Sequence, residues 1–420
     1  LSNICCARMG VKPTDSDTTE KCKRRYKRPM KMKFSRREFT LRTDKVRARM
    51  DKAGIDVLLV TDPANMNYLT GYDGWSFYVH QMVALSLDES EPVWIGRPMD
   101  GNGARVTTYL KEENILDYPD YYVQSERHHP MHRVAEIAKS RGWHKKRIGV
   151  EMEAYYFTAG AMAALRKKLP RTRFKDAHHL VNWVRIIKSR KELEYMTEAA
   201  RILERMMRVA IDNVRPGIRQ CDAAAEIWRA GVSGTRQFGG DYPSIPPMLP
   251  TGAGLAAPHL TWSDDKFKHG EGTALELAGV RHRYQCPMAR TVFLGQPPKK
   301  MRDSAKVVLE GLQSALDAMT PGTTAEEVEA AWRRVISRHG ITKESRIGYS
   351  TGLNYPPDWG EHTISLRAGD KTVLQENMTL HCVPAIAMDG WAIELSECVK
   401  VTNKGGKPLC NFPRKLFVKR

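Results

Sequence analysis

The sequence predicts an α/β domain followed by an α+β domain, and three observations support this prediction. The chain has 420 residues, which is enough for two domains that each bury a hydrophobic core. Its first part alternates short apolar runs with segments of helical periodicity, as a sheet covered by helices does. Its second part contains two pairs of long helices, and a Pro-Gly step separates the helices of each pair.

The first domain is expected at 33–184, after a basic segment at 1–32. The spacing of its apolar residues predicts the elements. Helices are expected at 36–53, 132–141 and 157–169, and strands at 55–60, 79–87, 92–95 and 147–150. The basic segment is polar and has no periodicity. It is expected to be a disordered extension, or the product of an upstream start with the natural start near Met30 or Met32.

The second domain is expected at 185–405, and a basic tail is expected at 406–420. Long periodic segments predict its helices, at 191–214, 220–231, 301–319 and 325–339. Pro216-Gly217 separates the first two helices, and Pro321-Gly322 separates the last two. This repeated order predicts a pseudo-symmetric domain, although the two halves are not visibly similar in sequence.

Two apolar segments, 275–279 and 286–291, predict the strands of a β-hairpin that carries one carboxylate, Glu276. Leu275 and Leu277 flank Glu276, so a strand would turn the carboxylate to the face opposite both leucines. Taken alone, that pattern favours a glutamate exposed to solvent. The motif around Glu276 is the reason to expect a functional role instead.

Composition and charge limit the classes of function. No apolar run approaches the roughly 20 residues of a membrane span, so no membrane partner is expected. The formal net charge is +19, but much of the excess lies at 21–49 and the rest is scattered, so nucleic acid is not expected as a partner. The eight cysteines form neither a CxxC pair nor a zinc spacing, which is typical of free thiols in the reducing cytoplasm.

Three motifs together resemble the creatinase/aminopeptidase P family, whose catalytic domain has the pita-bread fold. They are Leu275-Glu276-Leu277-Ala278-Gly279 with its following strand, Gly348-Tyr349-Ser350-Thr351-Gly352, and Trp391-Ala392-Ile393-Glu394. In the metallopeptidases of that family, these segments supply two Asp, one His and two Glu to a pair of metal ions. The matching positions here are Glu276, Pro287, Tyr349, Val383 and Glu394. Proline and valine side chains cannot ligate a metal, so the resemblance implies no metal and no other cofactor.

The same resemblance implies which residues carry the chemistry. Creatinase, a metal-independent member, acts on a cationic guanidinium-type group with one His and two Glu, and the matching residues are His259, Glu276 and Glu394. Contacts to substrate are expected from Tyr349, His362, His381, Trp75 and Tyr78. The last two lie on a loop that, in homodimers of the family, reaches into the partner's active site, so a homodimer is implied.

Longer strings resemble the ectoine hydrolase branch of this family, above all Asn354-Tyr355-Pro356-Pro357-Asp358-Trp359-Gly360-Glu361. The resemblance implies opening of ectoine's cyclic amidine to N-acetyl-2,4-diaminobutyrate. Glu276 would act as the nucleophile or as the base that directs water, and His259 would shuttle the proton. The expected partner is a small zwitterionic or cationic amidine, and the sequence does not separate ectoine from hydroxyectoine or another amidine.

Two alternative functions compete with this reading. A metal-dependent Xaa-Pro peptidase would need the ligands that Pro287 and Val383 lack. A non-catalytic binding module on the same fold would have no reason to keep His259, Glu276 and Glu394 together.

Overall fold

The computed structural model describes residues 32–388 and 390–420, and the chain divides into two compact units between His178 and His179. The basic segment predicted at 1–32 lies outside the described residues, apart from Met32. The division falls before the predicted start at 185, because the helix preceding it is tied to the second unit. There Asn182 Nδ2 donates to the Glu361 carbonyl oxygen at 3.1 Å.

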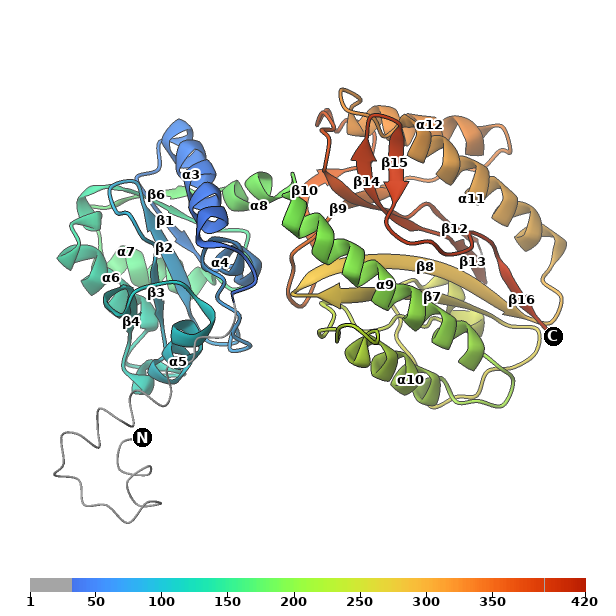
Figure 1. The fold of residues 1–420 in the computed structure, drawn as a ribbon, viewed down its shortest axis with the longest axis horizontal. Helices are drawn as coiled ribbons and strands as arrows, with labels where there is room; N and C mark the ends of the chain where they lie inside the picture. Colours follow the sequence, from blue (N-terminus) through green and yellow to red (C-terminus); the bar gives the residue numbers. More distant parts are fainter. Residues whose placement is uncertain (1–31, 389) are drawn as a thin grey trace, which may run out of the picture. The chain divides into compact units, whose positions relative to one another are not determined.

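The first unit is a six-stranded sheet of order β4-β3-β2-β1-β5-β6, with helices packed against it (Figure 1). β2 lies antiparallel to both β1 and β3, and the remaining neighbours are parallel. Its strands are β1 (Val57–Val60), β2 (Met82–Ser86), β3 (Val93–Gly96), β4 (Ile115–Asp117), β5 (Arg147–Val150) and β6 (Arg173–Asp176). Its α-helices are α3 (Arg36–Ala53), α4 (Pro63–Thr70), α5 (Pro98–Thr107), α6 (Pro130–Ser140) and α7 (Ala159–Lys168).

The sheet of the first unit is buried on both faces, as the short apolar runs predicted. Val57 and Leu59 of β1 share a buried cluster with Val134 of α6 and Leu165 of α7. Leu58, between them, is also buried, and it points to the other face because side chains alternate along a strand. The predicted α/β character of this unit is therefore confirmed.

The described residues of the second unit form three sheets and two pairs of long helices, preceded by a short helix. The sheets have the orders β16-β8-β7, β10-β9-β11-β14-β15 and β12-β13. The helices are α8 (Leu180–Arg185), α9 (Arg190–Asn213), α10 (Gln220–Ser233), α11 (Lys299–Ala318) and α12 (Ala325–Ser337), with a short 3-10 helix η4 (Gly252–Ala256). The long strands are β7 (Gly272–Arg281) and β8 (Tyr284–Leu294). The others are β9 (Gly348–Thr351), β10 (Gly360–Ser365), β11 (Thr379–Cys382), β12 (Ala385–Met388), β13 (Trp391–Glu394), β14 (Glu397–Thr402), β15 (Gly405–Pro408) and β16 (Phe417–Lys419).

The predicted hairpin is confirmed as β7 and β8, which pair antiparallel along their whole length. Helix α9 lies along it (Figure 1). Gly279 allows this close packing, because a Cβ atom at that position would lie 2.1 Å from the Ala199 carbonyl oxygen in α9. The helix therefore fixes the strand that carries Glu276.

Residues 406–420, expected to be a basic tail, instead belong to the second unit. β15 pairs with β14, and β16 pairs in parallel with β8. The segment between them is held by the buried guanidinium of Arg290, whose Nε donates to the Pro413 carbonyl oxygen at 2.8 Å. The basic composition of 406–420 predicted a tail surrounded by solvent. Strand pairing and the contact with Arg290 instead hold this segment against the second unit.

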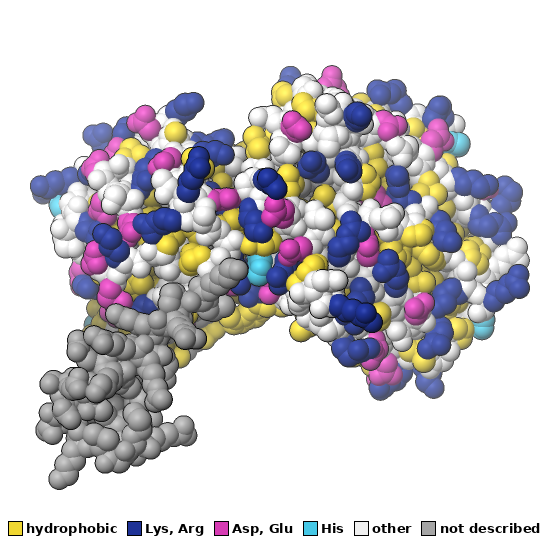
Figure 2. Space-filling model, in the orientation of Figure 1, with side chains coloured by type: hydrophobic (Ala, Val, Ile, Leu, Met, Phe, Trp, Pro, Cys, Tyr) yellow, Lys and Arg dark blue, Asp and Glu magenta, His cyan; other side chains and the backbone are white. Residues whose placement is uncertain are grey.

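The surface agrees with the scattered charge read from the sequence. Figure 2 shows Lys and Arg side chains spread over the visible face, with Asp and Glu between them. No helix within residues 32–388 and 390–420 is long and apolar enough to cross a bilayer.

Candidate active site

Glu276 stands in the middle of β7, and main-chain bonds fix it on both sides. Across the hairpin it pairs with Ala289 of β8. On the other side its N–H donates to the Met248 carbonyl oxygen at 3.1 Å, and its carbonyl oxygen accepts from Met248 at 3.0 Å. The residue is only 8% exposed, so the solvent-facing position that alternation favoured is wrong. The strand is buried on both faces, which alternation with leucines does not reveal.

Glu394 is brought to the same hairpin by one threonine. The Glu394 N–H donates to Thr291 Oγ1 at 2.9 Å, and Thr291 Oγ1 donates to the Glu394 carbonyl oxygen at 3.0 Å. Because Thr291 lies on β8, these bonds hold β13 against the strand beside Glu276. The Glu394 side chain is also buried.

The electrostatics place the two carboxylates within range of each other. Burial first, then the charges of Glu394 and Asp358, raise the pKa of Glu276 well above its ordinary value. Burial raises the pKa of Glu394 to about 7, against the opposing charge of Lys343. No hydrogen bond or ion pair to either carboxylate is formed by the described residues. The pair is therefore a buried acidic site whose ionised form a bound cation would stabilise.

Tyr349 and His381 face each other across paired strands β9 and β11. His381 Nδ1 lies 3.0 Å from the Tyr349 hydroxyl oxygen, and Trp359 Nε1 donates to that oxygen at 2.7 Å. His381 Nε2 lies 2.7 Å from Ser396 Oγ, which accepts from the Ala289 N–H at 2.6 Å. Since Ala289 is the strand partner of Glu276, this network ends beside the carboxylate site.

His362 interacts with the carboxylate of Asp358. Its Nε2 lies 3.1 Å from Asp358 Oδ2, and its ring stacks on that of His179 at 5.8 Å between centroids. Burial would raise the pKa of Asp358, but the bonds from His362 and the Gly360 N–H lower it below its ordinary value. His362 is therefore partnered with a carboxylate that stays ionised.

His259 lies in the segment between η4 and β7, the strand that carries Glu276. It is exposed in the loop after η4. Across residues 32–388 and 390–420, no hydrogen bond or ion pair involves its side chain. Its role as proton shuttle stays a prediction.

Trp75 and Tyr78 lie in the first unit and are 56% and 71% exposed. Trp75 packs on Phe77 with ring centroids 5.0 Å apart, and Arg97 Nη2 donates to the Tyr78 hydroxyl at 3.3 Å. They belong to a loop rather than to the core, as the neighbouring glycines indicated. Their contact with substrate stays a prediction.

Five residues of the site were not singled out from the sequence. Asp358 and Trp359 belong to the string 354–361 that resembles the ectoine hydrolase branch, but they had no assigned role. Ser396 lies between two strands, and no motif marks it. Lys343 and Arg346 lie before β9, where no periodicity marks them. The Arg346 guanidinium lies 4.4 Å from the centroid of the Tyr349 ring.

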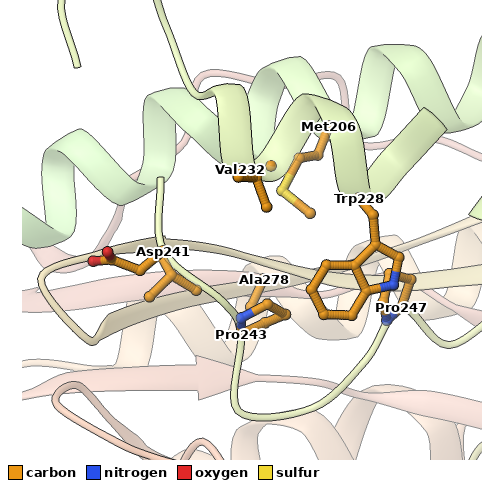
Figure 3. Close-up of a pocket in the computed structure, with 9 residues that line it drawn as sticks. Met206, Trp228, Val232, Asp241, Pro243, Pro247 and Ala278 are labelled. Carbon is orange, nitrogen blue, oxygen red and sulfur yellow. The ribbon is translucent and has the colours of Figure 1, made fainter. Parts of the chain in front are cut away.

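The second unit also has an apolar pocket that neither Glu276 nor Glu394 lines. Met206 and Trp228, from α9 and α10, and Ala278 of β7 line it (Figure 3). Its one charged lining residue is Asp241. Because it offers no convergent polar groups, we do not assign the chemistry to this pocket.

The donor set does not fit the pair of metal ions that the fold implies. Of the five matching positions, Glu276 and Glu394 offer carboxylates, and Tyr349 offers a hydroxyl that is bonded to two ring nitrogens. Pro287 and Val383 offer no donor side chain. Among the described residues, no group of three or more His, Cys, Asp or Glu side chains could hold a metal ion.

Comparisons with known proteins agree with the architecture. A family model described as Metallopeptidase family M24 matches residues 194–403, and one described as Creatinase/Prolidase N-terminal domain matches residues 42–187. The ectoine hydrolase of Halomonas elongata is 47% identical over 393 residues, covering 92% of this chain and 98% of that protein. The Xaa-Pro dipeptidase of Pyrococcus horikoshii is 24% identical over 375 residues, covering 88% and 96%.

Solved structures share the fold at lower identity. The X-Pro aminopeptidase of Thermotoga maritima superposes with a TM-score of 0.74 at 19% identity, covering 90% of this chain and 99% of that one. The prolidase of Pyrococcus horikoshii gives a TM-score of 0.74 at 22% identity, with the same coverage. The predicted fold class, an α/β domain followed by a pita-bread domain, is confirmed.

Proposed function

We propose a function for this chain on the premise that it belongs to metallopeptidase family M24: it is a metal-independent hydrolase that opens the cyclic amidine of ectoine to N-acetyl-2,4-diaminobutyrate. The observation that carries the proposal is the buried pair of carboxylates, Glu276 and Glu394, at a site that lacks the family's other ligands. The relative named ectoine hydrolase supports the choice of substrate.

The pair suits a planar cation. Two buried carboxylates repel each other when both are ionised, and the described residues offer neither of them a hydrogen-bond donor. Without a ligand, the site therefore leaves charge or polar atoms uncompensated. An amidinium group offers both a positive charge and N–H donors, which carboxylates accept in well-directed bonds. A neutral peptide offers no such charge and needs a metal to polarise its carbonyl.

In the proposed reaction, Glu276 attacks the amidine carbon or directs a water onto it. The oxygen of that water ends on the carbon, one ring C–N bond breaks, and the leaving nitrogen takes a proton to become an amine. His259 delivers that proton, and Glu394 pairs with the cationic ring. The two routes differ in one step. In direct attack, the Glu276 carboxylate first forms a covalent adduct with the amidine carbon, which water then hydrolyses; in the other route, water attacks that carbon directly.

The substrate's own carboxylate needs a cation at the edge of the site. His362 is among the residues expected to contact the substrate, but its ring is engaged by Asp358. Arg346 is the stronger group, because guanidinium is always charged and lies over the ring of Tyr349. Lys343, whose charge acts on Glu394, adds to the same edge.

The wider setting is proposed on the resemblance. We expect a cytoplasmic homodimer whose Trp75 and Tyr78 contact the substrate bound by the partner chain. Their exposure supports this, since an aromatic face that is open to solvent can pack on a cation.

The test is ring opening of ectoine by chelator-treated protein, followed by NMR. Turnover is expected without added metal and should vanish in Glu276→Ala and Glu276→Gln. The matched control is Glu271→Gln, just before the same strand, which should keep wild-type turnover. Activity that appears only with Mn²⁺ or Zn²⁺ would instead support the peptidase, and inactivity under both conditions would favour a binding role.

A further inference from the structure

The Tyr349 hydroxyl accepts one hydrogen bond whose direction is certain. The indole Nε1 of Trp359 has only a donor, so it donates to the Tyr349 oxygen across 2.7 Å. The second neighbour of that oxygen is His381 Nδ1 at 3.0 Å. Which of these two atoms donates depends on where the imidazole carries its proton.

Ser396 decides the position of that proton. Its Oγ accepts from the Ala289 N–H at 2.6 Å, and its own hydrogen must find an acceptor. Within the described ranges, the acceptor in reach is His381 Nε2 at 2.7 Å. His381 Nε2 is therefore unprotonated and accepts from Ser396. The imidazole proton lies on Nδ1, which donates to the Tyr349 hydroxyl oxygen. Burial, and then the charge of Arg346, lower the pKa of His381 to about 3, which keeps the ring neutral.

The Tyr349 oxygen thus accepts two hydrogen bonds, and its own proton points elsewhere. Burial, and then the charge of Glu276, raise the pKa of Tyr349 well above its ordinary value, so the hydroxyl stays protonated. No side chain of the described residues accepts this proton. A substrate or an attacking oxygen near Glu276 is the acceptor that remains.

We propose that Ser396 and His381 are positioning residues that hold the Tyr349 hydroxyl as a hydrogen-bond donor to the oxygen that becomes bonded to the substrate's amidine carbon. The inference rests on the proposed function. An amidinium carries N–H donors at its reacting end, so the substrate alone offers Tyr349 no acceptor there. When Glu276 takes a proton from the attacking water, the oxygen of that water gains negative charge. The hydrogen bond from Tyr349 therefore strengthens on the way to the transition state, and the inference applies to the route in which Glu276 directs water.

Kinetics of ectoine opening test the donor. Tyr349→Phe should lower kcat about 100-fold with little change in KM, as loss of one transition-state donor does. Ser396→Ala should lower kcat less, because it frees the His381 proton to move to Nε2. In the Tyr349→Phe background, Ser396→Ala should have no further effect. Equal losses in both backgrounds, or a change confined to KM, would overturn the proposal.

A neighbouring serine supplies the control. Ser350 is also fully buried, and its Oγ lies 2.6 Å from Thr363 Oγ1. It follows Tyr349 on β9 and so points to the opposite face. Ser350→Ala should keep wild-type kcat, and His381→Asn should keep more activity than His381→Leu, because an Asn amide can still donate to Tyr349.

The tautomer can be observed without turnover. NMR of protein labelled with ¹⁵N-histidine, with the His381 signal assigned by its loss in His381→Asn, should show the proton on Nδ1 up to high pH and its shift in Ser396→Ala. A proton on Nε2 in the wild type would overturn the positioning role. If ectoine is not opened, the donor role falls with the proposed function, while this measurement still decides the orientation of the network.

Discussion

In the proposed site, Glu276 and Glu394 would serve catalysis at a cost to the stability of the fold. Each carboxylate is buried without a hydrogen-bond donor from the described part of the chain, and burial raises both pKa values. A charged group in that position costs stability, which a site can tolerate because a cationic substrate offsets the cost on binding. Two predictions follow from the sign of these shifts.

The first concerns activity and pH. A carboxyl whose pKa is raised to about 7 is protonated in acid and cannot pair with a cation. We therefore expect kcat/KM for ectoine to rise with pH through about 7 as Glu394 ionises, and to keep rising until Glu276, whose pKa is raised well above its ordinary value, is ionised too. Glu394→Gln should flatten this rise. A wild-type profile that is flat from acid to neutral pH would contradict the assignment.

The second concerns stability. Because the folded-state pKa of Glu394 lies above its unfolded value of 4.5, the folded state favours the protonated form, and stability is lost as pH rises from 4.5 through about 7. Glu394→Gln removes this loss. The free energy of unfolding should increase by on the order of 3 kcal/mol at pH 8 and change little at pH 4.5. Calorimetry checks this, with Glu271→Gln as the control that should show no such pH dependence.

At the scale of elements, the β7–β8 hairpin is held in place by the helix that packs on it. In Gly279→Ala the new Cβ would meet backbone atoms of α9, 2.1 Å from the Ala199 oxygen and 2.5 Å from the Leu203 nitrogen. Backbone cannot yield as a side chain can, so we expect a loss of about 2 kcal/mol or more and a lower melting temperature. Activity should fall as well, because the hairpin carries Glu276.

Gly103→Ala is the matched control for this substitution. Gly103 lies inside α5, and a Cβ atom there would have only a Tyr72 ring atom at 3.8 Å. Alanine should be neutral there or stabilise the helix by up to about 1 kcal/mol. A Gly279→Ala variant as stable as this control would show that α9 can move away from the strand.

Helices and strands could be predicted from the sequence where the pattern of apolar residues along the chain marks them. The helix at 36–53 was predicted with its observed bounds from the spacing of its apolar residues. In the structure Ser35 caps its start, and Gly54 ends it in a left-handed conformation. The edge strand β6 was missed, since Arg173, Lys175 and Asp176 mask any strand pattern. The two carboxylates were singled out through motifs. The contact between Ser396 and His381, in contrast, depends on the pairing of β11 with β14, the strand that begins just after Ser396. A contact that depends on how two strands pair cannot be predicted from a single sequence.

At the scale of the whole molecule, the proposed homodimer can be tested by mixing two variants. If Trp75 of one chain completes the site of its partner, Trp75→Ala and Glu276→Gln should each be inactive alone. Co-expressed, they should recover about a quarter of wild-type activity, since half of the dimers are mixed and each mixed dimer has one intact site. A co-expressed sample no more active than its parents would place both residues in the same chain's site, or exclude Trp75 from it.

The paired carboxylates also affect how this protein behaves in a common laboratory reagent. Guanidinium is a planar cation with N–H groups arranged like those of an amidinium, so it suits the space between Glu276 and Glu394. At millimolar concentration, guanidinium chloride should raise the melting temperature and compete with ectoine, whereas sodium chloride at equal ionic strength should do neither. A denaturant used at molar strength to unfold proteins would, in trace amounts, act on this one as a stabilising ligand.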